Sequence, residues 1–341
     1  MQDINKTHLS NFILLGFSER SEVEIPLFVI FLLIYLLTLT GNLGMIVLIQ
    51  TDPHLQSPMY FFLSNLSFID ICYSSIILPR LLYDLLADRK VISYIACAAQ
   101  MWFFTLYATT ECYLLAAMAY DRFAAICNPL FYPVAMAKKV CLQLVAGCYM
   151  VGLVNASVHA CGIFRLSFCG PNEINSFFCD IPPLLRLSCS DSYVSKVVLF
   201  VLSTFVVVAN AVIVFVSYSY IISTILRMQS STSRQKTFST CASHLTAIIL
   251  YYGSLTFMYV QPGGLEAVEQ DKIVSVFYTI VIPMLNPVIY SMRNEEVKKA
   301  MKKRLCKKIS SQHLKLCSFH ISHGADGKVQ VNDKGCPLIN Q

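Results

Sequence analysis

From Ile25 to Thr51 the chain reads IPLFVIFLLIYLLTLTGNLGMIVLIQT, a stretch without a single Asp, Glu, Lys or Arg. About 20 apolar residues, in a helix that rises about 1.5 Å per residue, cross the hydrocarbon core of a bilayer. In lipid the peptide groups must hydrogen-bond to one another, and a β-barrel strand would be only about half as long. The stretch therefore predicts a transmembrane helix.

Six further stretches follow the same pattern. Four of them are free of charged residues, and two carry one acid each, Asp70 and Glu111. In chain order the six are Pro53–Pro79, Val91–Tyr120, Val140–Phe164, Val197–Leu226, Thr237–Leu265 and Ile273–Met292. Over all 341 residues, 56% are hydrophobic and 13% charged, with a mean hydropathy of +0.59, a balance that excludes a soluble enzyme. We therefore predict an all-α membrane protein, a seven-transmembrane helix bundle.

Lysine and arginine indicate the orientation of the seven spans, because basic residues gather on the cytosolic side of membrane proteins. With the N-terminus outside, seventeen of the 26 basic residues fall in inner segments, and eight of these lie between Arg293 and Lys308. We therefore expect the N-terminus outside and the C-terminus in the cytosol.

The chain is expected to have four parts. These are an extracellular segment (1–24), the transmembrane domain (25–292), a basic juxtamembrane helix (293–308) and a disordered cytosolic tail (309–341). No cleavable signal peptide is visible, since residues 1–24 lack an apolar core. Of the three Asn-x-Ser/Thr sequons, those at Asn65 and Asn155 lie inside spans, which leaves Asn5 as the expected glycosylation site.

Four of the 14 cysteines are expected in the oxidising compartment. They are Cys97, at the outer start of the third span, and Cys169, Cys179 and Cys189, between the fourth and fifth spans. Such cysteines usually pair, but four of them allow three pairings, and their spacing does not choose among these. The alternative is that they are unpaired. A metal site is not expected, because no Cys-x-x-Cys and no neighbouring His accompanies them.

Asp70 and Glu111 are the only acids in mid-span, and a carboxyl group within a membrane is costly enough to indicate a function. We expect the two to share a polar site that holds a proton or a monovalent cation. The alternative is that each is protonated and hydrogen-bonded to a neighbour such as Asn42 or Asn286.

Two further features carry less information by themselves. Asp121 and Arg122 end the third span at its inner face, where adjacent charges are often only side chains that reach toward water. Pro283 and Pro287 interrupt the seventh span, where each removes a backbone N–H and favours a kink.

Five motifs in order, at consistent separations, resemble the signature stretches of the odorant receptors, a family of rhodopsin-like G-protein-coupled receptors. They are PMYFFLSNLSFID (Pro58–Asp70), MAYDRFAAIC (Met118–Cys127), SYSYI (Ser217–Ile221), KTFSTCASHL (Lys236–Leu245) and PMLNPVIYSMRN (Pro283–Asn294). The resemblance covers the chain from about residue 5 to residue 305. Two inner sequences depart from the family pattern, Leu55-Gln56-Ser57 and Phe123-Ala124-Ala125, and these affect the expected coupling strength more than the fold.

The resemblance implies a receptor in the plasma membrane of olfactory neuron cilia. It would bind a small neutral volatile molecule and activate a heterotrimeric G protein of the stimulatory olfactory type, which raises cyclic AMP. The implied disulfides are Cys97–Cys179 and Cys169–Cys189. The implied activation and coupling residues are Asp121, Arg122, Tyr218, Asn286, Pro287 and Tyr290, and the implied cation site is Asp70, Glu111 and Asn286. No cofactor is expected other than a sodium ion at that site.

By the same resemblance, the odorant cavity lies among the outer halves of spans three, five, six and seven. Helical spacing places one face of the third span toward it, and similarity supplies the rest. The expected ligand-binding residues are Phe104, Thr105, Ala108, Thr109, Cys112, Leu202, Ser203, Val206, Val207, Tyr252, Leu255, Tyr259, Val276 and Thr279. The alternative for each is ordinary helix packing. This lining carries no charge, so a buried amine would lack a counter-ion, and a neutral lipophilic ligand is expected.

The runner-up function is a seven-helix ion translocator or transporter, which the absence of a chain of charges in the spans disfavours. An enzyme is not expected, because no His cluster, Ser-Lys pair or second acid dyad lies at a common depth. The basic residues form no stripe for nucleic acid. The run that ends at Lys308 suits an acidic protein and anionic lipid, and Cys306 within it is a candidate for palmitoylation.

Overall fold

The structure is a computed structural model that describes residues 11–17, 21–168, 172–189, 192–259, 268–294 and 296–304. Contacts divide the chain into two compact units, Met1–Arg293 and Asn294–Gln341. Several sequence predictions fall outside the described residues. They concern Asn5, Cys169, Cys306, Lys308 and the tail 309–341.

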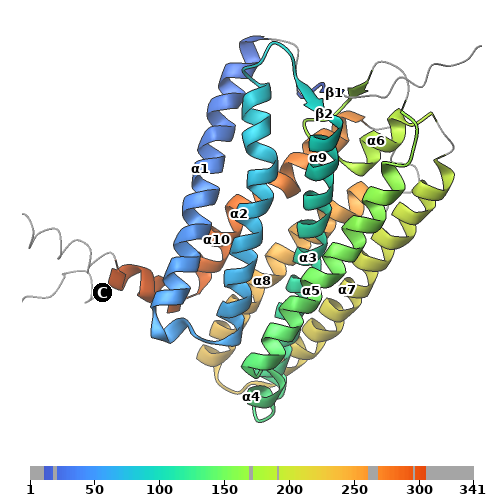
Figure 1. Ribbon diagram of the computed structural model, residues 1–341. Helices are drawn as coiled ribbons and strands as arrows, with labels where there is room; N and C mark the ends of the chain where they lie inside the picture. Colours follow the sequence, from blue (N-terminus) through green and yellow to red (C-terminus); the bar gives the residue numbers. More distant parts are fainter. Residues whose placement is uncertain are drawn as a thin grey trace, which may run out of the picture. The chain divides into compact units, whose positions relative to one another are not determined.

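Among the described residues of the first unit, six long helices and one interrupted helix form the bundle (Figure 1). They are α1 (Ser21–Thr51), α2 (Pro58–Asp84), α3 (Tyr94–Cys127), α5 (Lys138–Ile163), α7 (Tyr193–Arg227), α8 (Ser231–Tyr259) and the series α9 (Val268–Val276), η2 (Phe277–Val281) and α10 (Ile282–Arg293). Within the described part of the chain, all of these except α3 are long and apolar enough to cross a membrane. The structure thus has the predicted all-α, seven-helix architecture.

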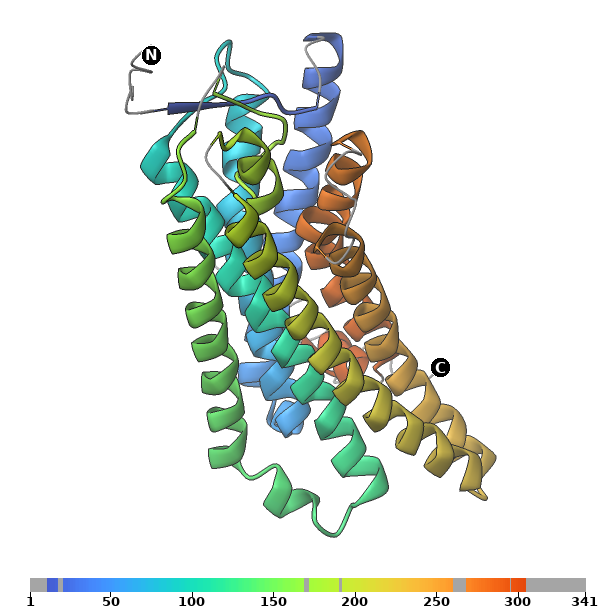
Figure 2. The ribbon, with the colours of Figure 1, turned by 90° about the vertical axis from the view of Figure 1, so that its right-hand side faces the viewer.

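The polarity of α3 follows from its place inside the bundle. It packs against α2, α5, α7 and α8, and in Figure 2 it crosses behind α5 and α7. Its polar residues Thr110, Glu111 and Asp121 are buried. In contrast, α1 exposes apolar side chains such as Leu33 and Leu37. A helix enclosed by other helices can carry polar groups that a lipid-facing helix cannot.

A small three-stranded sheet covers one end of the first unit. Its strands β1 (Asn11–Leu14), β2 (Val91–Ser93) and β3 (Glu173–Ile174) lie in the order β2-β1-β3. β1 runs antiparallel to β2 and parallel to β3. Because side chains alternate along a strand, Phe12 and Leu14 are buried while their neighbours are exposed.

This end also holds the short helix α6 (Ile181–Leu187), which packs in one apolar cluster with the buried side of β1. Cys97 and Cys179 belong to the same cluster. We call it the disulfide end. The opposite end, which we call the Arg122 end, has two short connecting helices, η1 (Pro53–Leu55) and α4 (Tyr132–Ala135).

Several boundaries differ from those predicted by the absence of charge. α2 begins at Pro58 rather than Pro53, because Asp52 caps the separate turn η1 and accepts the His54 N–H at 3.0 Å. It continues past Pro79, since Arg80 and Asp84 form an ion pair of 2.7 Å one turn apart. An uncharged stretch shows which residues can lie in lipid. Capping groups and side-chain ion pairs, in contrast, determine where a helix begins and ends.

Other boundaries differ as well. Residues Val91–Ser93, expected within the third span, form β2. α7 begins at Tyr193 rather than Val197, and α8 begins at Ser231 rather than Thr237.

The seventh helix departs from regular α-geometry just before its first proline. Residues Phe277–Val281 form a π-helical turn, and Pro283 follows in α10. Proline has no N–H to donate within the helix, so the hydrogen-bond pattern must change near it. The side-chain amide of Asn42 donates to the Pro283 carbonyl at 3.0 Å and so ties α1 to this segment.

The second unit is described over residues 294 and 296–304, and residues 296–304 are helical. The Asn294 side chain caps this helix, because its Oδ1 accepts the N–H groups of Glu296 at 3.0 Å and Val297 at 3.4 Å. The predicted basic helix extended from 293 to 308, and residues 305–308 lie outside the described part.

Candidate functional site

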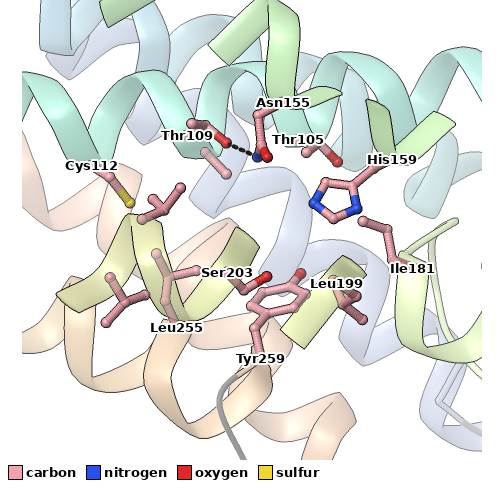
Figure 3. Close-up of a pocket in the computed structure, with 13 residues that line it drawn as sticks. Thr105, Thr109, Cys112, Asn155, His159, Ile181, Leu199, Ser203, Leu255 and Tyr259 are labelled. Atoms are coloured by element: carbon pink, nitrogen blue, oxygen red, sulfur yellow. Dashed lines mark hydrogen bonds between the residues drawn. The ribbon is translucent and has the colours of Figure 1, made fainter. Parts of the chain in front are cut away.

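A cavity of about 60 Å³ lies inside the disulfide end of the bundle. Its walls come from α3, α5, α7 and α8, and Ile181 of α6 closes it (Figure 3). The lining residues are Thr105, Ala108, Thr109, Cys112, Asn155, His159, Ile181, Leu199, Ser203, Val206, Val207, Leu255 and Tyr259. Within the described residues this lining contains no Asp, Glu, Lys or Arg.

Nine of the residues predicted to bind a ligand meet around this single cavity. They are Thr105, Ala108, Thr109, Cys112, Ser203, Val206, Val207, Leu255 and Tyr259. The helical spacing on the third span therefore selected a face that does turn toward a cavity. That these side chains bind a ligand stays a prediction.

Phe104 does not line the cavity, because it packs in an aromatic cluster beside it. Its ring centroid lies 5.1 Å from that of Tyr73, 5.0 Å from that of Phe178 and 6.1 Å from that of Tyr278. Residues 104 and 105 are neighbours in sequence and so point about 100° apart around the helix. Only Thr105 faces the cavity.

Four more predicted residues, Leu202, Tyr252, Val276 and Thr279, also lie outside the lining. The Tyr252 hydroxyl donates to the carbonyl of Cys112 at 2.6 Å, and the Thr279 hydroxyl donates to the carbonyl of Ser275 at 2.6 Å. These hydroxyl groups are engaged by backbone. The spacing of residues along one helix does not show which of its side chains a neighbouring helix separates from the cavity.

Asn155, His159, Leu199 and Ile181 were not predicted from the sequence. The cavity was expected among spans three, five, six and seven, whereas Asn155 and His159 come from α5, the fourth span. Both are polar residues in the second half of a largely apolar helix, and this signal could have identified them. The His159 ring points into the cavity in Figure 3. Ile181 could not have been placed, because it comes from α6, a short helix in the connection between the fourth and fifth spans.

Two hydrogen bonds organise the polar wall of the cavity. The Asn155 side-chain amide donates to the Thr109 hydroxyl at 2.8 Å and so joins α5 to α3. The Thr105 hydroxyl donates to the carbonyl of Met101 at 2.8 Å within α3. Serine and threonine often bond in this way to the preceding helical turn.

The disulfide Cys97–Cys179 joins α3 to the loop above the cavity, with 5.4 Å between the Cα atoms. This is the pairing that the resemblance implied. Gln100 supports it, since its Oε1 accepts the Cys179 N–H at 2.9 Å. Cys189 is also disulfide-bonded, but its predicted partner, Cys169, lies outside the described residues, and that pairing stays a prediction.

Asp180 follows directly and is 1% exposed. Its Oδ1 accepts the N–H of Ile181 at 2.7 Å. Its Oδ2 accepts the hydroxyl of Tyr259 at 2.8 Å and that of Tyr278 at 3.3 Å. One carboxylate therefore connects the loop to α8 and to η2, and the sequence analysis did not foresee it.

The two mid-span acids, Asp70 and Glu111, lie in one buried polar cluster; that this cluster holds a cation or a shared proton stays a prediction. Asn286 donates to both carboxylate oxygens of Asp70, at 3.1 and 3.2 Å. Glu111, 1% exposed, lies beside Asn286 and Tyr251 and within electrostatic reach of Asp70. The Oδ1 atoms of Asn42 and Asn286 are buried without a hydrogen-bond partner in the described part of the chain. Carboxylate and amide oxygens are suitable ligands for a hard cation, so this site fits a sodium ion.

At the Arg122 end, the Arg122 guanidinium contacts Asp121 Oδ2 through Nη2 at 2.6 Å and Nε at 2.9 Å. The Tyr132 hydroxyl of α4 donates to Asp121 Oδ1 at 2.9 Å. Burial, and next to it the charge of Asp121, raise the pKa of this hydroxyl, which therefore remains a donor. Asp121 itself is fully buried, so these two partners offset the loss of its hydration.

Next to this pair lies a second contact, between α7 and α8. The Tyr218 hydroxyl is 2.7 Å from Nδ1 of His244, and the His244 ring centroid is 6.5 Å from that of Tyr290. Tyr218 and Tyr290 were predicted activation residues. His244 was not singled out, although it lies within the motif KTFSTCASHL.

These features together define a seven-helix membrane receptor. A cavity without charged residues lies near a disulfide-bonded loop, a polar site lies midway along the bundle, and an Asp-Arg pair lies at the far end of α3. Comparisons with known proteins identify the group more closely. The olfactory receptor family matches residues 31–308.

Individual relatives agree with that match. The chain is 56% identical over 303 residues to "Olfactory receptor 5B21" of Homo sapiens, an alignment that covers 89% of this chain and 98% of the relative. It is 50% identical over 307 residues to "Olfactory receptor 5G9" of Mus musculus, covering 90% and 98%. It is 55% identical over 299 residues to "Olfactory receptor 9I1" of Homo sapiens, covering 88% and 95%.

The chain belongs to the olfactory receptor family of G-protein-coupled receptors. It is therefore a multi-pass protein of the plasma membrane and a receptor for odorants, rather than an enzyme or the ion translocator or transporter weighed as the alternative.

Proposed function

We propose that this receptor binds its odorant in the cavity beneath the disulfide-bonded loop and activates a stimulatory, cyclic AMP-raising G protein at the Arg122 end. In this proposal the disulfide end is extracellular, the C-terminus is cytosolic, and the receptor works in olfactory cilia. The single observation that carries the proposal is the cavity itself, which collects residues of α3, α5, α7 and α8 around one uncharged space.

The proposed ligand is small, neutral and lipophilic. Six of the thirteen lining residues are aliphatic, and four carry hydroxyl groups, Thr105, Thr109, Ser203 and Tyr259. The nearby carboxylate of Asp180 already accepts three hydrogen bonds from the protein. A buried amine would therefore have no free counter-ion and would lose its hydration without compensation.

We propose that activation begins when the odorant widens the cavity. Ligand pockets of proteins measure at least about 300 Å³, and a cavity of about 60 Å³ cannot hold an odorant without movement of its walls. The Tyr251 and Tyr252 hydroxyls of α8 donate to the carbonyls of Ala108 and Cys112, at 2.8 and 2.6 Å.

These bonds hold α8 against the same turns of α3 that line the cavity. An odorant that separates the two helices shifts the population toward an arrangement with α8 moved outward. In that arrangement Arg122 leaves Asp121 and meets the G protein, while Tyr218 and Tyr290 rearrange around it. Asn286 and Pro287 allow the seventh helix to follow. A sodium ion held by Asp70, Glu111 and Asn286 would favour the resting packing.

Basic groups at the Arg122 end support the proposed coupling. They include Arg227 at the end of α7 and Arg234 near the start of α8, which suit an acidic protein surface and anionic lipid. The lysines of helix 296–304, which belong to the second unit, suit the same partners. Outside the described residues, Asn5 is the proposed glycan site, Cys169 the proposed partner of Cys189, and Cys306 the proposed palmitoylation site.

An odorant panel tests the proposal. The full chain, tagged at its N-terminus to measure surface expression, is expressed with a reporter of G-protein dissociation and, separately, with a cyclic AMP reporter. The expected result is activation by neutral odorants that is lost in a cavity variant, Ala108→Trp, and kept in Val201→Trp, which changes an exposed side chain of α7. Equal activation of both variants would contradict the assigned cavity. Dissociation without cyclic AMP would contradict the stimulatory class.

A further inference from the structure

Asp180 determines the direction of the hydrogen bonds that Tyr259 and Tyr278 make with it beside the cavity. A carboxylate can only accept hydrogen bonds. The Tyr259 hydroxyl lies 2.8 Å from Asp180 Oδ2 and must therefore donate its proton to it. Tyr259 lines the cavity, so the group that remains for a ligand is its oxygen, an acceptor.

A second hydroxyl of the cavity also donates its proton to an acceptor of the protein. Thr105 donates to the carbonyl of Met101 at 2.8 Å, and a carbonyl is also only an acceptor. The Thr105 oxygen is thus a second acceptor in the lining. The other polar residues of the lining are Thr109, Asn155, Ser203 and His159. Asn155 donates to Thr109, whereas within the described residues Ser203 and His159 make no hydrogen bond to the protein. They can accept or donate as the ligand requires.

We propose that Asp180 is a specificity-determining residue: by holding the proton of Tyr259, it makes the receptor prefer odorants that donate a hydrogen bond, alcohols and phenols, over ketones, aldehydes and ethers of the same skeleton. This inference rests on the proposed function, namely that the cavity is the odorant site. Asp180 acts through Tyr259 as a positioning residue and does not itself line the cavity.

The preference for alcohols follows from which groups of the cavity can donate a hydrogen bond and which can only accept one. An odorant hydroxyl beside Tyr259 donates to its oxygen and accepts from Ser203 or His159. A carbonyl or ether oxygen at the same place can accept from Ser203 or His159, but it meets the Tyr259 oxygen with no proton between them. The difference is one hydrogen bond within a buried site, about tenfold in potency.

The surrounding contacts hold Asp180 in this position. The preceding residue, Cys179, is bonded to Cys97 and donates its N–H to Gln100. Asp180 Oδ1 accepts the N–H of Ile181 at 2.7 Å, which leaves Oδ2 directed at the two tyrosines. An Asn at this position would keep its oxygen on the Ile181 N–H and place its NH₂ group at the tyrosines. That NH₂ donates to Tyr259 and releases the tyrosine proton toward the cavity.

The test compares odorants that share a carbon skeleton and differ in one group. Each set contains an alcohol, the corresponding aldehyde or ketone, and the methyl ether. Potencies are measured by G-protein dissociation for the wild type, Asp180→Asn, Tyr259→Phe and the control Ser254→Ala. The control removes another hydroxyl from α8, one that donates to the Leu250 carbonyl and lies outside the cavity.

We expect the wild type and the control to prefer alcohols by about tenfold. In Asp180→Asn the carbonyl compounds gain potency and the ratio falls toward one. In Tyr259→Phe the ratio also falls, because the alcohol loses its acceptor. Should Asp180→Asn fail to reach the cell surface, the ratio in Tyr259→Phe decides the question.

Three outcomes would overturn the inference, and they are distinguishable. Equal potencies of alcohols and carbonyl compounds on the wild type contradict the role of Asp180 and leave the receptor function intact. An alcohol-to-carbonyl potency ratio that is unchanged in both variants does the same. A receptor that reaches the surface and responds to no neutral odorant contradicts the proposed function, and this inference with it.

Discussion

Replacing Gly152 by alanine should strain the contact between α3 and α5 beside the cavity. A Cβ atom at residue 152 would lie 2.7 Å from the Leu106 carbonyl oxygen, and closer still to Thr110 Oγ1. Neither atom can easily withdraw, because the Thr110 hydroxyl donates to that same carbonyl at 2.7 Å and the carbonyl belongs to the backbone of α3. The two helices must therefore separate.

The size of the effect follows from three contributions. Overpacking a well-packed site costs about 1–3 kcal/mol. Asn155 lies one turn further along α5, and loss of its 2.8 Å bond to Thr109 would cost about 1 kcal/mol more. Against this, a Gly to Ala change inside a helix gains up to about 1 kcal/mol. The expected net result is a destabilisation of about 1–3 kcal/mol.

Gly147→Ala is the matched control, because it lies on the same helix and an added Cβ would meet nothing within 4 Å. Thermal unfolding of the detergent-solubilised receptor and the fraction at the cell surface are the measurements. We expect Gly152→Ala to unfold at a lower temperature than the wild type, and Gly147→Ala to match or exceed it. If Gly152→Ala is as stable as Gly147→Ala, then α3 and α5 do not approach as closely as described, and the reasoning is refuted.

Four further predictions concern the other sites. Cys97→Ala should remove the receptor from the cell surface, since the loop above the cavity loses its covalent attachment to α3; normal trafficking of this variant, measured with an N-terminal tag, would contradict that. Arg122→Ala should abolish odorant-driven cyclic AMP and leave surface expression unchanged, and undiminished signalling would count against its assigned role. Tyr252→Phe removes the 2.6 Å hydrogen bond to the Cys112 carbonyl, which is worth about 0.5–1.5 kcal/mol. Signalling without odorant should therefore rise by about two- to tenfold. Basal cyclic AMP per surface receptor tests this, with Ser254→Ala as the control. If the cation site binds sodium, the wild type should unfold at a higher temperature in sodium chloride than in choline chloride. Asp70→Asn should remove this difference, and a difference that persists in the variant would argue against the cation site.

Much of the architecture is predictable from the sequence because lipid imposes a single strong constraint. A stretch such as Ile25–Thr51 has few alternatives to a transmembrane helix. The ends of the helices are less predictable, since they depend on local partners. The cap at Asp52 and the pair Arg80–Asp84 both move the limits of α2, and neither affects whether the segment can lie in lipid.

The cavity divides in the same way into predictable and unpredictable parts. The face of α3 that carries Thr105, Thr109 and Cys112 follows from helical periodicity, and it does line the cavity. The contributions of α5 and of the loop depend on how helices cross in space. Asn155 reaches the cavity because Gly152, one turn earlier, lets α5 approach α3 closely. A spacing rule applied within one helix contains no information about such an approach.

Under the proposed function, the arrangement of α3 connects a ligand in the cavity with a G protein at the Arg122 end. This single helix carries Thr105 and Cys112 at the cavity, Glu111 at the mid-depth polar site, and Asp121 with Arg122 at the far end. The two tyrosines of α8 bond to its carbonyls at residues 108 and 112, which belong to the turns that line the cavity and lie on either side of Glu111 in the sequence. A change in the distance between α3 and α8 at the cavity therefore acts at the turn that holds Glu111. Farther along, α8 contacts α7 through His244 and Tyr218 near Arg122, so the same displacement also disturbs the surroundings of the Asp-Arg pair. Coupling between the cavity and the Arg122 end therefore requires only that α3 and α8 can pack in two different ways. It does not require a series of residues that move one after another.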